Sequence, residues 1–181
     1  MNDGEGARDR AGAAEGTVRP ARPEDVPAIL GLVRELADYE REPEAVVATE
    51  RMFHEALFGP RPAVFAHVVE HRDGAVRAGE PAVVGMALWY LTFSTWLGRH
   101  GLWLEDLYVR PEHRGRGYGR LLLEELARVC VERGYGRLEW WVLDWNEPAQ
   151  GFYRTRGGRP MEDWTVWRVD GHPLRRLAAG D

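Results

Sequence analysis

The order of apolar and polar positions predicts alternating strands and helices after a polar N-terminal stretch. Apolar residues recur at helical spacing over residues 26–37, which is typical of a helix with one buried face. Residues 82–93 are apolar nearly throughout and predict a central strand. By the same criteria we expect strands at 17–19, 64–71, 82–93, 102–109, 137–143 and 164–169, and helices at 26–37, 44–58, 120–133 and 148–156, followed by a short amphipathic tail at 174–179.

This succession predicts an α/β protein with a mixed central β-sheet and helices on both faces. Hairpins dominate the first half, and strand–helix–strand crossovers follow in the second. Residues 1–16 are rich in Gly, Ala and charge without apolar periodicity, so we expect a disordered tail. Residues 17–179 are then expected to form a single domain.

Composition narrows the class of protein. The chain has 44% hydrophobic and 29% charged residues, no run of 18 apolar residues, and no apolar core of a signal peptide near its start. Cys130 is the only cysteine, which is compatible with a reducing compartment. The formal charge of −5 argues against nucleic acid as a partner and suits a cationic substrate. We therefore expect a cytoplasmic protein without a membrane or nucleic-acid partner.

A glycine-rich turn stands between the strand at 102–109 and the helix at 120–133. It reads Arg114-Gly115-Arg116-Gly117-Tyr118-Gly119. Glycines let the backbone approach an anion closely, and the N–H groups at a helix start point towards it. The turn lacks the Lys-Ser/Thr end of a Walker loop, and Arg120 replaces the third glycine of the dinucleotide fingerprint. A plain β–α connection without a ligand is the alternative.

Four motifs in the same order resemble the GNAT N-acetyltransferase family. Besides Arg-x-x-Gly-x-Gly, the chain has Leu-Glu-Asp-Leu-Tyr-Val at 104–109, Val-Leu-Asp-Trp-Asn-Glu-Pro-Ala at 142–149 and Phe-Tyr-Arg-Thr-Arg-Gly at 152–157. The resemblance extends to the diamine (spermidine/spermine) and thialysine N-acetyltransferases. It implies the GNAT fold, acetyl-CoA as cosubstrate, a homodimer, and transfer to a diamine, polyamine or lysine-like amine by direct attack in a ternary complex.

The resemblance also implies roles for individual residues. Glu105 is the expected general base; the alternative is that it only forms an ion pair at the end of the strand. Tyr153 is the expected general acid; the alternative is a tyrosine packed in the core. For Asn146 the alternative is a plain turn residue. For the arginines among the cofactor-binding residues the alternative is a solvated side chain without a ligand. The expected cofactor-binding residues are Leu107, Tyr108, Val109, Arg114, Gly115, Arg116, Gly117, Tyr118, Gly119, Arg120, Asn146 and Arg156.

The acceptor amine is expected to meet Tyr39, Glu40, Trp96 and Glu105. A solvated helix end is the alternative for Tyr39 and Glu40, and a dimer contact the alternative for Trp96. Where the polyamine enzymes have an acidic residue, this chain has Ser94-Thr95, which weakens the case for long polyamines.

Other residues limit the chemistry. Strand alternation places Asp106 on the face opposite Glu105 unless a bulge interrupts the strand. Cys130 lies on the apolar face of its helix, so we expect an inert thiol and no acetyl-enzyme. The six histidines lack metal-ligand spacing, and no metal is expected. Two other functions remain open: acetylation of a protein lysine or an antibiotic amine, and a non-catalytic acyl-CoA sensor.

Overall fold

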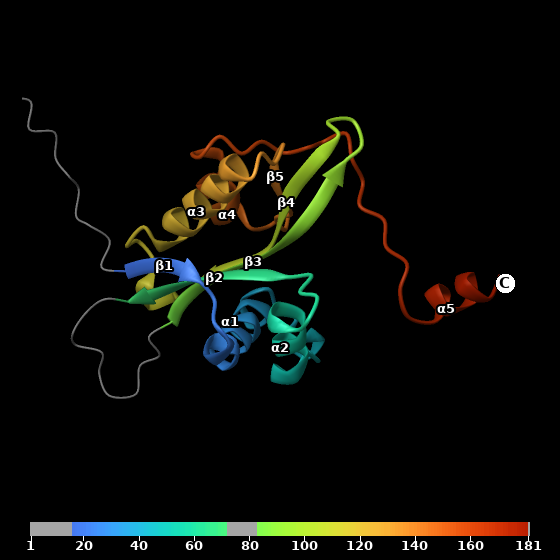
Figure 1. The fold of residues 1–181 in the computed structure, drawn as a ribbon, viewed down its shortest axis with the longest axis horizontal. Coiled ribbons are helices and arrows are strands. Elements are labelled where there is room, and N and C mark those ends of the chain that lie inside the picture. The colour runs from blue at the N-terminus through green and yellow to red at the C-terminus, as the bar shows by residue number, and fades with distance from the viewer. Residues whose placement is uncertain (1–15, 72–82, 181) are drawn as a thin grey trace, which may run out of the picture. The chain divides into compact units, whose positions relative to one another are not determined.

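The computed structural model describes residues 16–71 and 83–180 (Figure 1). The chain falls into two compact units. Unit 1 ends at Trp141 and unit 2 begins at Val142. The N-terminal tail expected at 1–16 lies outside the described residues except for Gly16, which begins the first strand. The single-domain organisation stays a prediction.

Unit 1 is built on a five-stranded mixed sheet. The strands are β1 (Gly16–Pro20), β2 (Phe65–His71), β3 (Val83–Ser94), β4 (Arg99–Val109) and β5 (Leu138–Trp140), and they lie in that order. The pairs from β1 to β4 are antiparallel, and β4 and β5 run parallel. The predicted mixed sheet, with the strand at 82–93 in its centre, is confirmed.

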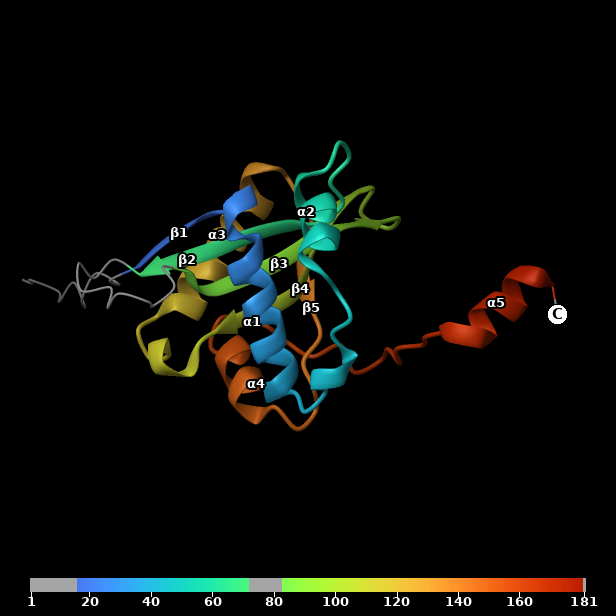
Figure 2. The same ribbon diagram turned by 90° about the horizontal axis from the view of Figure 1, so that it is seen from below.

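Helices cover both faces of this sheet, as expected. Helices α1 (Val26–Tyr39) and α2 (Glu50–Phe58) lie on one face and α3 (Tyr118–Glu132) on the other (Figures 1 and 2). Short 3-10 turns, η1, η2 and η3, span Pro23–Asp25, Pro43–Ala45 and Pro111–His113. Unit 2 contains α4 (Glu147–Arg154) and α5 (Gly171–Ala179).

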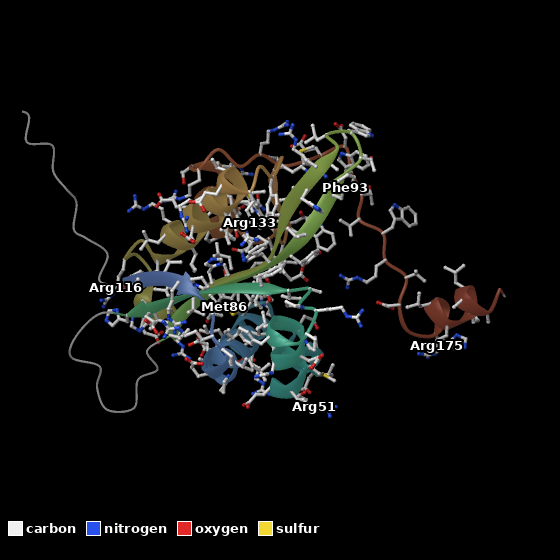
Figure 3. The ribbon with its side chains drawn as sticks, viewed as in Figure 1. Arg51, Met86, Phe93, Arg116, Arg133 and Arg175 are labelled. Atoms are coloured by element: carbon white, nitrogen blue, oxygen red, sulfur yellow. The ribbon has the colours of Figure 1, made fainter. Side chains whose placement is uncertain are left out.

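The core fills the space between the sheet and the helices. On the α1 side, Ile29 and Leu32 pack with Val68 and Met86 of the sheet, and all four are completely buried. Figure 3 marks Met86 within the sheet. On the other side Leu126 of α3 is equally buried, together with Leu122 one turn earlier. The apolar face predicted for the main helix is therefore its buried face.

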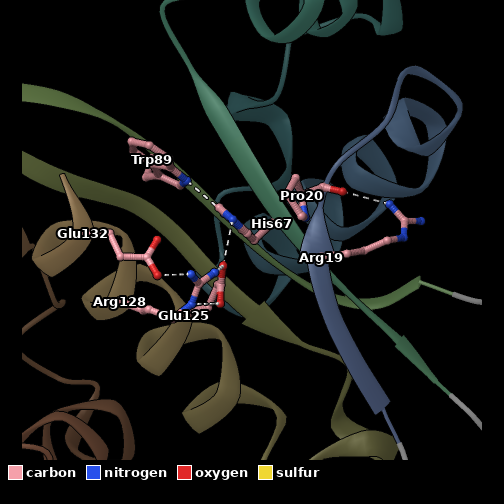
Figure 4. A network of polar contacts seen from close by, with 7 residues as sticks. All are labelled: Arg19, Pro20, His67, Trp89, Glu125, Arg128 and Glu132. Atoms are coloured by element: carbon pink, nitrogen blue, oxygen red, sulfur yellow. Dashed lines mark hydrogen bonds and ion pairs between the residues drawn. The ribbon is translucent and has the colours of Figure 1, made fainter.

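A polar network connects α3 to the sheet and runs from the buried His67 and Trp89 to exposed side chains of α3 (Figure 4). The indole N–H of Trp89 donates to Nδ1 of His67 at 3.1 Å, and Nε2 of His67 lies 3.5 Å from a carboxylate oxygen of Glu125. Arg128 pairs with Glu125 at 2.5 Å and with Glu132. Burial lowers the pKa of His67, so the ring is neutral at pH 7, accepts from Trp89 and donates towards Glu125.

Two predicted elements are clearly shorter in the structure. The helix expected at 44–58 begins only at Glu50, because the Thr49 hydroxyl accepts from the Met52 N–H and caps it there. The strand expected at 137–143 is shorter, as β5 ends at Trp140.

The strand expected at 164–169 is wrong. This segment has no regular structure, and Trp164 and Trp167 are 70% and 91% exposed. Alternating apolar residues form a strand only beside another strand that takes up their backbone hydrogen bonds. Within the described part of unit 2 there is no strand to provide them.

Candidate active site

The candidate site begins at the point where the pairing between β4 and β5 ends. The parallel pairing joins Leu102–Leu104 to Leu138–Trp140 and goes no further. Across β4, the register with β3 shifts, because Leu88 opposes Asp106 while Trp89 opposes Leu104. Glu105 is therefore the extra residue of a β-bulge, which bends the strand. Within the described residues, β4 has no neighbouring strand on the β5 side from Glu105 to its end.

This open edge of β4 contains the predicted cofactor residues Leu107, Tyr108 and Val109. Their side chains are largely packed, and Tyr108 and Val109 are 6% and 9% exposed. What the edge offers to a ligand is therefore mainly backbone N–H and C=O groups. Such an edge can receive an extended chain containing amide groups in the way a sheet receives another strand.

The glycine-rich turn follows directly at the start of α3. Gly115 and Gly117 have φ values of +77° and +84°, a backbone region that favours glycine. Gly117 caps α3 without a side-chain hydrogen bond, and no acidic residue stands in the first helical turn. Arg120 adds a positive charge there. The turn therefore presents N–H groups, the positive end of the helix dipole and a cation together, which fits a bound pyrophosphate.

Arg114 and Tyr118 connect the glycine-rich turn to the sheet. The Nε–H of Arg114 donates to the carbonyl of Val109 at 2.9 Å. The Tyr118 side chain is almost completely buried, and its hydroxyl lies 2.7 Å from Nδ1 of His71 at the end of β2. Tyr118 thus acts in this fold as an anchor for the first residue of α3.

Carboxylates gather beside the bulge. Glu105 is exposed and accepts a hydrogen bond from the indole N–H of Trp103 at 2.9 Å. Burial, and then the charges of Glu105 and Glu40, raise the pKa of Asp106 to about 6. Burial also raises the pKa of Glu40. Three acidic side chains therefore share one neighbourhood at the open edge of β4.

Asp106 is the functional candidate that the sequence reasoning missed. Unbroken alternation would have turned it away from Glu105, but the bulge removes the basis of that expectation. The Leu-Glu-Asp run was visible in the sequence, whereas the register shift between β3 and β4 was not. The electrostatic effect of Glu105 and Glu40 on Asp106 places these groups within range of one another.

The acceptor residues expected from the resemblance are only partly brought together. Tyr39 and Glu40 lie at the C-terminal end of α1, and Glu40 acts on Asp106. Trp96 lies in the turn between β3 and β4 and is 90% exposed. About 20 Å of strand separates this turn from Glu105. The structure therefore does not group Trp96 with the acidic residues.

Unit 2 holds the remaining predicted residues. Tyr153 lies on α4 with its ring packed edge-on against Phe152 at 5.1 Å, and burial raises its pKa to about 12. The side chain of Asn146 accepts from the Ala149 N–H and caps α4. The Arg156 guanidinium lies 4.5 Å from the centre of the Phe152 ring. The predicted roles of Tyr153, Asn146 and Arg156 stay predictions.

Over residues 16–71 and 83–180, no group of three or more His, Cys, Asp or Glu side chains is arranged to hold a metal ion. The helices in these same ranges include none with the length and apolar character needed to cross a membrane.

Comparison with known proteins defines the class. Residues 30–157 match the Acetyltransferase (GNAT) family. The chain belongs to this family, whose members use acetyl-CoA, and it is an N-acetyltransferase. The resemblance to this family and the predicted GNAT fold are thereby confirmed.

Individual relatives are similar over most of their length. The thialysine N-epsilon-acetyltransferase of Bos taurus is 37% identical over 89% of this chain and 96% of its own. The L-ornithine N5-acetyltransferase of Arabidopsis thaliana is 28% identical over 88% and 86%. Among solved structures, an integron cassette protein from V. cholerae superposes with a TM-score of 0.73 at 22% identity, covering 92% of this chain and 99% of its own. The last similarity shows the fold alone.

Proposed function

We propose that the protein acetylates a primary amine of a small lysine-like substrate by direct attack within a ternary complex. The observation that carries this proposal is the group of carboxylates at Glu40, Glu105 and Asp106 beside the open edge of β4. An ammonium group needs negative charge to offset its loss of water. The similarity to the thialysine and ornithine acetyltransferases supports this acceptor class.

The cofactor site follows from the two backbone features. The pyrophosphate binds at the turn from Gly115 to Arg120, where the N–H groups of α3 and the arginine charge meet it. The pantetheine arm pairs with the backbone of residues 107–109 along the edge that β5 leaves open. Asn146 and Arg156 provide further contacts. Acetyl-CoA supplies the activated thioester.

Glu105 takes the proton of the acceptor ammonium. An alkyl ammonium with a pKa of about 10.4 is almost wholly protonated at neutral pH and must lose its proton to attack. The indole N–H of Trp103 holds the Glu105 carboxylate, and the charge of Glu105 contributes to the raised pKa of Asp106 beside it. Since the pKa of Asp106 is about 6, this neighbouring carboxyl group can hold a proton near neutral pH.

Tyr153 returns a proton to the departing sulfur. Because burial raises its pKa to about 12, the phenol keeps its proton at every physiological pH. It therefore stands as a neutral donor when the thiolate forms. From the resemblance we further propose that the enzyme works as a homodimer in the cytoplasm.

Release of free thiol with a panel of amines tests the function. We expect higher kcat/KM for thialysine, lysine and ornithine than for putrescine and spermine. The resemblance supports this order, because Ser94-Thr95 stands where the polyamine enzymes have an acidic residue and brings no charge for a second, distant ammonium. A clear preference for spermine would contradict the order. Release of thiol with none of the amines would contradict the proposed function.

A further inference from the structure

Arg114 connects three parts of unit 1 that the proposed function treats separately. Its Nε–H donates to the carbonyl of Val109 at the end of β4. Its guanidinium carbon lies 5.3 Å from the centre of the Tyr39 ring on α1 and 5.5 Å from that of Tyr108 on β4. Both distances lie within the range of cation–π attraction, about 6 Å. Arg114 itself begins the glycine-rich turn.

The two rings differ in how firmly the fold holds them. Tyr108 on β4 is 6% exposed, whereas Tyr39 is 37% exposed in the last turn of α1. The sheet therefore fixes Arg114 through Tyr108 and the Val109 carbonyl. Arg114 in turn holds the Tyr39 ring, which has less packing of its own.

A second arginine holds the preceding turn of the same helix. Arg110, which follows β4, pairs with Glu35 of α1 at 2.8 Å. Glu35 and Tyr39 stand four residues apart and so lie on one face of α1. The short segment from Arg110 to Arg114 thus fastens the end of α1 at two successive turns.

We propose that Arg114 is a positioning residue for the acceptor, in addition to its place in the cofactor turn. It holds Tyr39, and with it the neighbouring Glu40, against β4. A residue of the cofactor turn therefore positions the side chains that contact the acceptor amine. This inference rests on the proposed function. It implies that a substitution of Arg114 weakens binding of the acceptor amine more than binding of acetyl-CoA, although Arg114 belongs to the cofactor motif.

Arg114→Lys separates the two roles. Lysine keeps the positive charge that favours phosphate but loses the planar guanidinium and its Nε–H. We expect the KM for thialysine to rise about 3- to 10-fold, in keeping with the loss of cation–π contacts. The KM for acetyl-CoA, and the Kd for CoA by calorimetry, should rise by a smaller factor than the thialysine KM, because lysine keeps the positive charge at the turn although it loses the hydrogen bond to Val109.

Arg133→Lys is the matched control. Its guanidinium also lies over an aromatic ring, 5.9 Å from the centre of Trp89, but next to the C-terminal end of α3. Both KM values should be those of the parent. Equal effects of the two substitutions would overturn the assignment to Arg114.

A double-mutant cycle identifies the contact. In a Tyr39→Leu background, Arg114→Lys should no longer change the thialysine KM, because the ring that it positions is gone. Additive effects would overturn the inference, as would a raised acetyl-CoA KM with an unchanged thialysine KM.

The same cycle in urea unfolding needs no activity. We expect the shifts in midpoint for Tyr39→Leu and Arg114→Lys to be non-additive, and additive shifts would overturn the contact. A parent enzyme that released no thiol with any amine would refute the proposed function, and the unfolding cycle would still decide the role of Arg114.

Discussion

Asp106→Asn should make the folded protein more stable at neutral pH while lowering its activity. The pKa of Asp106 is raised from 3.8 to about 6, so the folded chain binds this proton more tightly than the unfolded chain. At 1.36 kcal/mol per unit of pKa, the ionised carboxylate costs up to about 3 kcal/mol of folding free energy. Asparagine has nearly the same shape and no charge, and therefore removes this cost.

The pH dependence gives the prediction its sign. Below about pH 4, Asp106 is protonated in both states, so the parent and the variant should have similar stability. Between pH 4 and pH 6 the unfolded chain loses this proton before the folded chain does. The free energy of unfolding of the parent therefore falls progressively below that of Asp106→Asn. Above pH 6 the difference should level off. For a chain of this length, about 3 kcal/mol corresponds to roughly 6–12 °C in Tm.

Thermal unfolding at pH 4, 5, 6 and 7.5 measures this difference. Asp38→Asn is the control, because it removes an exposed carboxylate from α1 and should show no such pH profile. In parallel, kcat/KM for thialysine should fall for Asp106→Asn, since the acidic pair beside the bulge loses one charge. A Tm difference that is constant with pH, or a variant less stable than the parent at pH 7.5, would refute the reasoning.

Three further predictions concern the cofactor turn, the acid and the thiol. Gly117→Glu introduces a side chain at φ +84° and a negative charge where the pyrophosphate binds, so calorimetry should show lost CoA binding; unchanged affinity would contradict the placement of the cofactor. Tyr153→Phe should lower kcat by roughly 10²–10⁴ with little change in Tm, and unchanged kcat would remove Tyr153 from the mechanism. Cys130→Ala should remain active, since burial raises the pKa of this thiol; an acetylated Cys130 found by mass spectrometry would refute direct attack.

The features that the sequence predicted well are those set by local pattern. The helical spacing from Val26 onwards marks the face of α1 that the structure buries. The glycines before α3 marked a turn in which two of them have positive φ. Each of these signals is complete within a few neighbouring residues, so no knowledge of the rest of the fold was needed.

The features that were missed depend on pairing between distant segments. The bulge at Glu105 arises from the register of β4 against β3, and nothing in the Leu-Glu-Asp run itself fixes that register. The segment at 164–169 has the apolar alternation of a strand but no strand beside it in its unit. Likewise, the contact of Arg114 with the Tyr39 ring joins residues 75 positions apart, and no local motif predicts it.

The short pairing of β5 also has a consequence for local opening of the fold. Three register pairs hold β5 to β4, whereas β3 is paired along nearly its whole length with β4 and along half of it with β2. The amides of Leu138 to Trp140 should therefore exchange with solvent deuterium through small local openings, and those in the middle of β3 only when the whole unit unfolds. A ligand bound along the adjacent edge of β4 would contact the side of the sheet whose amides are least protected from exchange. Occupancy of the site would then be visible as slowed exchange in β4 and β5, with β3 unaffected.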